Sequence, residues 1–266
     1  MKKADFVNTI YSYYRANKRP FAWRKTKNPY RVLVSEIMLQ QTQTSRVISK
    51  YESWLKKFPD VQHLASASVA EVLKEWQGLG YNRRALALKK TAEVVVKKYR
   101  SRFPKTYEEI LELPGIGPYT AGAVMAFAYN KSFPIIETNI RTVFIHFFFR
   151  DKKGVHDKDI LKLVEETLDT ENPREWYYAL MDYGVMLKKT MGNLNTKSRH
   201  YTKQTPFKGS NREVRSMILK ELQQTSATAA QLRKKLTTVD KDKIDINLSA
   251  LQKEGFIKRK GQVFLI

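Results

Sequence analysis

Residues 111–124, LELPGIGPYTAGAV, place three glycines and two prolines inside a segment whose flanks have helical character. The pattern predicts a helix, a tight turn over Pro114 to Pro118, and a second helix. Gly115 and Gly117 let the backbone approach a ligand closely, and the second helix begins with backbone N–H groups at the positive end of its dipole. An anion such as a phosphate suits this arrangement. A plain helical hairpin is the alternative, and the motif alone does not separate the two.

The charge of the chain also favours an anionic partner. Among 266 residues there are 49 Lys and Arg against 26 Asp and Glu, a formal net charge of +23. Such a surplus attracts polyanions and releases counterions on binding, which predicts a nucleic acid as partner. A thermophilic or high-salt surface and an acidic membrane are the alternatives. Aromatic residues between the cations of residues 11–25, YSYYRANKRPFAWRK, add faces on which bases can stack.

Other classes of protein are excluded or disfavoured by what the sequence lacks. With no cysteine, the chain has no disulfide, no thiolate nucleophile and no cysteine ligands for zinc or an iron–sulfur cluster. The four histidines lie far apart in sequence without metal-site spacing, so we expect no metal centre: His63, His146, His156 and His200. No apolar run is long enough to span a membrane, and residues 1–15 read as a first helix rather than a signal peptide. We expect a cytoplasmic or nucleoid protein that does not bind membranes.

Helical periodicity dominates the chain up to about Leu187. Helices are predicted over four ranges: 30–41, 69–76, 85–99 and 174–187. Residues 191–210 are basic and rich in polar residues, typical of a linker or extended arm. Two helices at 212–224 and 227–238, a third ending at Gly255, and two strands around 259–261 then resemble a winged helix. The prediction is an all-α protein with two helical lobes in residues 1–190, a basic linker at 191–210 and a winged-helix-like domain at 211–266.

Five motifs, taken together, carry a resemblance to a known family. In chain order they read FAWRKTKNPYRVLVSEIMLQQTQ, WQGLGYNRRALALKKTA, LPGIGPYTAGAVMAFAY, PIIETNIRTV and MDYGVML. Over residues 1–190 the sequence resembles the helix-hairpin-helix DNA glycosylase superfamily, and within it the MutY-type adenine-DNA glycosylases. The resemblance implies an enzyme of base excision repair that acts, as a monomer, on double-stranded DNA containing a mismatched or damaged base.

Cleavage of an N-glycosidic bond needs a proton donor for the base and a carboxylate for the developing sugar cation. Glu36 interrupts an apolar helical face, and apolar surroundings would raise its pKa. It matches the family glutamate that protonates adenine. A structural ion pair with an arginine is the alternative. Glu137 stands where relatives have a stabilising aspartate, one methylene shorter. Asn139 matches a family asparagine that would orient Glu137 or a water, or it caps a helix starting near Ile140. Tyr119 replaces the Schiff-base lysine of bifunctional relatives, which implies no lyase step.

The resemblance also assigns residues that bind DNA and the target base. Gln41 matches the wedge that fills the gap left by a flipped base, and Tyr81 matches an aromatic residue that intercalates beside the opposite base. Arg19, Trp23, Arg24 and Asp182 match residues of the base pocket; a surface carboxylate at the end of an amphipathic helix is the alternative for Asp182. Gly115, Gly117 and Thr120 of the hairpin are expected to contact the DNA backbone.

Several departures from the family pattern limit the prediction. The four cysteines that generally hold an iron–sulfur cluster after the position of Leu187 are absent, so no such cofactor is expected, and the basic arm would contact phosphates instead. A monovalent cation at the hairpin is left open. The family's Nudix-like C-terminal domain, which recognises 8-oxoguanine, is replaced by the winged-helix-like segment. Phe21 and Ala22 stand where relatives commonly have Leu-Pro.

We therefore predict a monofunctional glycosylase that removes adenine mispaired with guanine or 8-oxoguanine and leaves an abasic site. One alternative is a thymine or uracil glycosylase acting on mismatches with guanine, which the altered pocket permits. Another is a DNA-binding protein that has lost catalysis through the exchange of aspartate for Glu137. A bifunctional lyase is the third.

Overall fold

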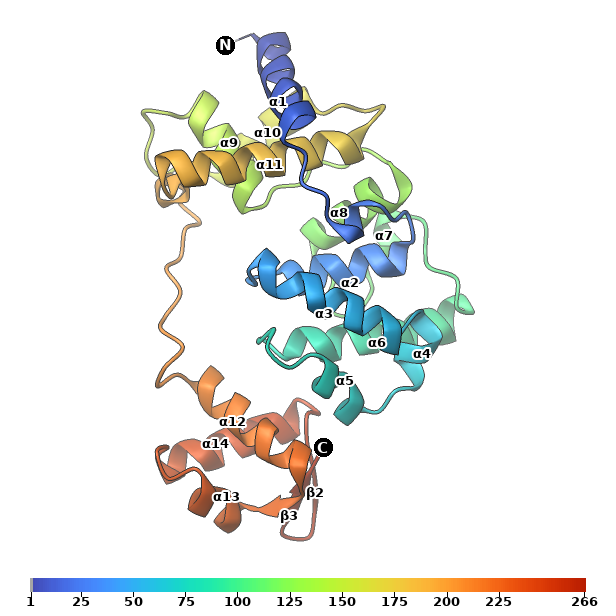
Figure 1. Cartoon of the computed structure of the whole chain (residues 1–266), viewed down its shortest axis with the longest axis vertical. Coiled ribbons are helices and arrows are strands. Elements are labelled where there is room, and N and C mark those ends of the chain that lie inside the picture. The colour runs from blue at the N-terminus through green and yellow to red at the C-terminus, as the bar shows by residue number, and fades with distance from the viewer. Residues whose placement is uncertain (1) are drawn as a thin grey trace. The chain divides into compact units, whose positions relative to one another are not determined.

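The computed structural model describes residues 2–266, and Figure 1 shows its elements coloured along the chain. The chain folds into two compact units, each built from two separate chain segments. The first unit comprises residues up to Gln40 together with Lys97–Thr202, and the second comprises Gln41–Val96 together with Lys203–Ile266.

Among its described residues, the first unit contains helices, connecting loops and an isolated β-bridge between Val155 and Ser198. Its elements are α1 (Lys3–Asn17), the 3-10 helix η1 (Ala22–Arg24), α2 (Pro29–Leu39), the last turn of α6 (Arg83–Tyr99), α7 (Tyr107–Leu111), α8 (Pro118–Tyr129), α9 (Thr138–Phe148), α10 (Asp157–Thr167), α11 (Pro173–Met191) and the 3-10 helix η2 (Leu194–Lys197). The long helix α11 packs against α9, α1 and α8, and α2 packs against α8. Helices α1, α9, α10 and α11 lie together in Figure 1.

Aromatic side chains fill the core between α1, α9 and α11. The ring of Phe6 is fully buried, and four other rings have their centroids within 5.8 Å of it: Phe144, Phe147, Phe148 and Trp176. Three of these four contacts are edge-on, the geometry that aromatic quadrupoles favour. This core fixes α9 against α11, and both helices carry residues of the candidate site.

The first segment of the second unit contains three helices and most of α6. They are α3 (Thr44–Lys57), α4 (Val61–Ser66) and α5 (Val69–Glu75). Asp60 caps α4 by accepting from two backbone N–H groups, and Ser68 caps α5 in a reciprocal capping box with Glu71. Trp54 and Trp76 are fully buried and meet edge to face at 5.4 Å, which packs α3 against the end of α5.

The second segment of this unit forms three helices and a small sheet. Its elements are α12 (Asn211–Gln224), β1 (Ala227–Thr228), α13 (Ala229–Lys235), α14 (Lys241–Lys253), β2 (Lys258–Lys260) and β3 (Val263–Leu265). The strand order is β1-β3-β2 with both pairs antiparallel. The expected helix over 227–238 was wrong at its start, because Ala227 and Thr228 pair with Phe264 and Val263, and Thr228 then caps α13.

The predicted mainly helical class, with a small winged-helix-like end, is confirmed. The helix expected over 30–41 ends earlier, at Leu39. Of the predicted first helix, residues 3–15 lie in α1 and Met1 lies outside the described residues. The domain boundaries at 190 and 210 stay predictions. Within residues 2–266, no helix is long and apolar enough to cross a membrane.

Candidate active site

Glu36 lies on α2, a helix buried along most of its length. Asn28 caps the helix by accepting a hydrogen bond from the N–H of Arg31 at 3.1 Å, and Pro29 occupies the first turn, where it costs no hydrogen bond. Residues 32–38 are all buried, and Glu36 is only 7% exposed. A carboxyl group therefore sits within an apolar helix, as the sequence predicted.

Tyr119 meets Glu36 from the first turn of α8. Its hydroxyl donates a hydrogen bond to Oε2 of Glu36 at 2.9 Å. Burial raises the pKa of Glu36 to about 7, and the charge of Glu137 adds to the rise, whereas the Tyr119 hydrogen bond and the charge of Arg24 oppose it. The pKa of Tyr119 is raised well above its usual value, chiefly by burial. Glu36 thus holds a proton near neutrality, and Tyr119 stays a neutral donor.

Glu137 is the N-terminal cap of α9. Its Oε1 accepts hydrogen bonds from the backbone N–H of Asn139 at 2.8 Å and of Ile140 at 2.9 Å, and its Oε2 accepts from the Asn139 side-chain amide at 3.1 Å. Burial raises the pKa of Glu137, and the three N–H donors oppose the rise by favouring the carboxylate. The alternative role given to Asn139, as cap of a helix from Ile140, was wrong: the helix begins at Thr138, and Glu137 caps it.

A glycine that sequence reasoning passed over brings α11 against the start of α9. A Cβ at Gly184 would lie 2.4 Å from the carbonyl oxygen of Asn139 and 2.7 Å from its Cβ, closer than atoms can approach. Only a glycine therefore allows this packing of α11 on the turn that carries Glu137 and Asn139. Its place inside the motif MDYGVML was the available signal.

Asp182, also on α11, organises two arginines. It is 3% exposed and accepts hydrogen bonds from Arg19 Nε at 2.5 Å and from Arg24 Nη1 and Nη2 at 2.8 and 2.7 Å. Burial opposes ionisation of Asp182, but the bonds and charges of Arg24 and Arg19 outweigh it and lower its pKa. The interpretation of Asp182 as a surface carboxylate was wrong, because it lies in the middle of α11 on the buried face.

Aromatic rings surround these arginines. The Arg24 guanidinium lies 4.5 Å from the ring centroid of Tyr178, and the rings of Phe21 and Trp23 are stacked at 4.7 Å. Trp23 is buried, so its ring anchors η1 to the core of the first unit. The structure therefore brings Arg19 and Arg24 together on Asp182, with Trp23 stacked on the Phe21 ring that both guanidinium groups approach. The charge of Arg24 also acts on Glu36.

The glycine-rich hairpin turn predicted over Pro114 to Pro118 joins α7 to α8. Gly115 has φ of +75°, a conformation that favours glycine, whereas Gly117 is extended and a Cβ there would meet nothing within 4 Å. The absence of a side chain at Gly117 leaves open space at the start of α8. Thr120 is buried, and its hydroxyl accepts a hydrogen bond from Gln40 Nε2 at 3.3 Å, so its side chain is used inside the protein.

The second unit holds Gln41 and Tyr81 on adjoining loops. Both have positive φ, +53° for Gln41 and +48° for Tyr81, which is uncommon for residues with side chains and concentrates at functional sites. Arg84 Nη2 donates to the hydroxyl of Thr42 at 3.0 Å and to the carbonyls of Leu79 and Gly80 at 3.0 and 2.9 Å. Arg84, which sequence reasoning did not single out, thus ties the Gln41 loop to the Tyr81 loop.

The basic arm is partly docked on the first unit. Asn195 in η2 is buried and donates from Nδ2 to Thr142 Oγ1 at 2.7 Å and to the carbonyl of Thr138 at 3.2 Å. An iron–sulfur cluster does not fit here, because it requires thiolate ligands and the chain has none. His156 and His200 lie far apart in sequence but close together in the structure, where their ring centroids are 4.5 Å apart. No metal-binding group of side chains occurs among residues 2–266.

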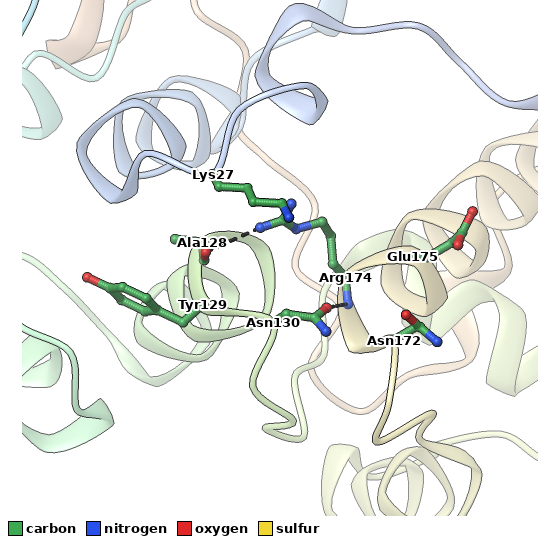
Figure 2. Close-up of a pocket in the computed structure, with 7 residues that line it drawn as sticks. All are labelled: Lys27, Ala128, Tyr129, Asn130, Asn172, Arg174 and Glu175. Carbon is green, nitrogen blue, oxygen red and sulfur yellow. Dashed lines mark hydrogen bonds between the residues drawn. The ribbon is translucent and has the colours of Figure 1, made fainter.

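A separate pocket of about 310 Å³ lies between the end of α8 and the start of α11. Figure 2 shows Lys27 beside Arg174 in this pocket, with Arg174 donating to the carbonyl of Ala128 and its backbone N–H to Asn130 Oδ1. None of the predicted site residues lines it. These hydrogen bonds join the end of α8 to the start of α11. The pocket does not contain the buried carboxyl that makes Glu36 a candidate proton donor.

The site therefore combines a carboxyl that is protonated near neutrality with a second carboxylate held by N–H donors. Acid-assisted cleavage of a bond to a sugar requires this pair. The HhH-GPD superfamily of base excision DNA repair proteins matches residues 34–169, which include Glu36, Tyr119 and Glu137. The chain belongs to this superfamily.

Individual relatives agree with that assignment. The adenine DNA glycosylase of Buchnera aphidicola subsp. Baizongia pistaciae is 36% identical over 187 residues, 68% of this chain and 52% of the relative. The thymine/uracil-DNA glycosylase of Methanothermobacter thermautotrophicus is 30% identical over 189 residues, 70% of this chain and 86% of the relative. The structure of a thermostable thymine-DNA glycosylase superposes with a TM-score of 0.64 at 28% identity, over 75% of this chain and 96% of the other. The chain spans about half the length of the three Buchnera aphidicola adenine DNA glycosylases that it matches.

Proposed function

We propose that this protein is a monofunctional DNA glycosylase that hydrolyses the N-glycosidic bond of adenine mispaired with guanine or 8-oxoguanine. The observation that carries the proposal is the buried Glu36 carboxyl, hydrogen-bonded to Tyr119 at 2.9 Å, with a pKa raised to about 7. Membership of a base excision repair superfamily and the similarity to adenine DNA glycosylases support the same conclusion.

In the proposed reaction Glu36 donates its proton to a ring nitrogen of the flipped adenine. The electron pair of the N-glycosidic bond leaves with the base, and positive charge develops on the sugar. Glu137, as the carboxylate favoured by its three N–H donors, stabilises that charge. Water then adds to C1′ and releases a proton, so that the products are free adenine and an abasic site, and Glu36 is reprotonated from solvent.

Tyr119 supports the monofunctional assignment. It occupies the position at which bifunctional relatives are expected to have an amine, and a phenol cannot form a Schiff base with the sugar. Its hydroxyl donates to Glu36 instead. The enzyme would therefore leave the DNA strand intact.

Contacts with DNA are proposed at three places. Gln41 would fill the gap left by the flipped nucleotide, and Tyr81 would enter the stack beside the opposite base. The open space at Gly117 and the N–H groups of the first turn of α8 suit a backbone phosphate. Whether the hairpin binds a monovalent cation is left open by the sequence, and DNA affinity measured after exchange of K⁺ for tetramethylammonium at constant ionic strength tests it. We expect the enzyme to act as a monomer.

The test is single-turnover base release from four matched duplexes. They carry A opposite 8-oxoguanine, A opposite G, T opposite G and U opposite G, each sampled with and without alkali treatment, with Glu36→Gln alongside. The proposal predicts adenine release that depends on Glu36, with strand breaks only after alkali. Strand breaks without alkali would instead identify a lyase, and tight binding without release from any duplex would favour a non-catalytic DNA-binding protein.

A second candidate is a thymine or uracil glycosylase acting opposite guanine. The specific observation in its favour is the match to the thymine/uracil-DNA glycosylase, which covers 86% of that relative. In the same panel it predicts release of thymine or uracil in preference to adenine.

A further inference from the structure

The C-terminal segment of the second unit contacts the turn that carries Tyr81. Nη1 of Arg212, in the first turn of α12, donates to the Tyr81 hydroxyl at 2.7 Å. The guanidinium of Arg212 also lies 5.4 Å from the centroid of the Tyr81 ring, and that of Arg84 lies 5.6 Å from it. Two cations therefore flank one ring, an arrangement that aromatic quadrupoles stabilise.

The Tyr81 turn is built to present its ring rather than to bury it. Gly78, Gly80 and Tyr81 all have positive φ, and the indole N–H of Trp76 donates to the carbonyl of Gly80 at 3.0 Å. A tyrosine in the left-handed region is strained, and such strain persists only where neighbouring contacts hold it. Yet the Tyr81 side chain remains 36% exposed. The turn holds the backbone, and Arg212 holds the end of the side chain.

The second terminal nitrogen of Arg212 also has a partner. Its Nη2 donates to the carbonyl of Thr205 at 2.6 Å, which anchors the guanidinium to the arm that leads into α12. The planar fork of an arginine suits this double engagement, because one nitrogen faces the phenol while another faces a carbonyl. A lysine has the same charge but only one side-chain nitrogen, so it lacks this fork.

A second ion cluster fastens the same two segments together. Glu254, at the end of α14, accepts two hydrogen bonds from Arg83 at 2.7 Å each and two from Arg215 at 3.0 and 2.7 Å. The bonds from Arg83, followed by those from Arg215, lower the pKa of Glu254 to about 2. Glu254 therefore stays ionised at physiological pH. Its bonds link Arg83, which lies two residues after Tyr81, to α12 through Arg215 and to the end of α14.

We propose that Arg212 is a positioning residue through which the C-terminal segment, residues 203–266, sets the conformation of Tyr81 and thereby recognition of the base opposite the target. This inference rests on the proposed function only for the identity of the reaction. The coupling between Arg212 and Tyr81 does not depend on which base is released. The segment carries far more Lys and Arg than Asp and Glu, so it adds favourable charge beside a ring that enters DNA.

The first experiment measures binding, so it does not depend on which base is excised. Wild-type protein, Arg212→Ala, Tyr81→Phe and the double variant are titrated against duplexes that carry a tetrahydrofuran abasic analogue opposite 8-oxoguanine, G or C. The expected result is a loss of affinity on the order of tenfold for each single variant, with the double variant no weaker than either. Additive losses would overturn the proposal, because they would mean that Arg212 and Tyr81 act separately.

The second experiment measures discrimination between opposite bases with the whole 266-residue chain. The ratio of single-turnover rates for the target base opposite 8-oxoguanine and opposite C should fall about tenfold in Arg212→Ala and in Arg212→Lys. Lys258→Ala is the matched control, an exposed cation on β2 of the same segment, and it should leave the ratio unchanged. Equal ratios in all variants would refute the inference even if adenine is released, whereas failure of the wild-type enzyme to release adenine would count against the proposed function alone.

Discussion

The hydroxyl of Tyr119 lies 2.9 Å from Oε2 of Glu36, so that the helix following the glycine-rich hairpin holds the carboxyl of α2. The bond opposes the rise in pKa that burial imposes on Glu36, and the balance leaves that pKa at about 7. Burial alone would make Glu36 a weaker acid than a proton donor at neutral pH should be.

Tyr119→Phe removes the donor that favours the ionised form of Glu36. The pKa of Glu36 should therefore rise further, and the pH above which base release slows should move upward. Single-turnover rates between pH 5.5 and 9.5 measure this, with Tyr129→Phe as a control, since Tyr129 bonds to the carbonyl of Pro104. An unchanged or lower alkaline limb would show that Tyr119 does not tune Glu36.

Ionisation of Glu36 should also appear in stability. Its pKa rises from 4.5 to about 7 on folding, so between these values the unfolded chain loses the proton while the native protein keeps it. The free energy of unfolding of the wild type should fall as pH rises through this window, by up to about 3 kcal/mol. Glu36→Gln has no carboxyl to ionise at this position, so it lacks this loss. Urea unfolding should therefore show the free energy of unfolding of the variant rising relative to that of the wild type between pH 4.5 and 8. A pH-independent difference would argue against a buried titrating Glu36.

Glu137→Gln separates charge from helix capping. A glutamine carbonyl can still accept from the N–H groups of Asn139 and Ile140, so we expect little change in the free energy of unfolding, while the rate of base release falls on the order of 100-fold or more. Glu137→Ala should lose the cap as well and cost about 1 kcal/mol. A wild-type rate in Glu137→Gln would reduce Glu137 to a structural cap.

Gly184→Ala should disturb the site without touching a catalytic group. The new Cβ would lie 2.4 Å from the carbonyl oxygen of Asn139, so α9 and its cap Glu137 must shift. We expect a loss of about 1–3 kcal/mol in unfolding free energy together with slower base release. Gly117→Ala is the matched control, because its Cβ meets nothing; it should unfold as the wild type does and lose DNA affinity.

The sequence predicted most of the helices, but not the contacts that the candidate site residues make. Apolar periodicity and Gly-Pro punctuation locate α2, α8 and α11, because these are local properties of the chain. Asp182 reads as a surface carboxylate because its partners, Arg19 and Arg24, lie more than 150 residues away in sequence. Capping by Asn139 was the alternative that the sequence left open, but Glu137 caps α9, since either side chain can cap the helix and the first helical residue decides between them.

Other contacts had no local signal. Asn195 lies in a segment whose composition is typical of a linker, yet its side chain is buried against Thr138 and Thr142. The pairing of Arg212 with Tyr81 joins residues 131 positions apart, between an ordinary amphipathic helix and a glycine-rich turn. Such contacts depend on tertiary packing, which periodicity does not encode.

The most direct measurement of the central claim is the pH dependence of single-turnover adenine release from a duplex with A opposite 8-oxoguanine, for the wild type and Glu36→Gln. If Glu36 is the proton donor, the wild-type rate falls as pH rises through about 7, and Glu36→Gln is slower by roughly 10²–10⁴-fold at neutral pH with no alkaline limb near 7. A Glu36→Gln enzyme that releases adenine at the wild-type rate, or that keeps the same limb, would contradict the account.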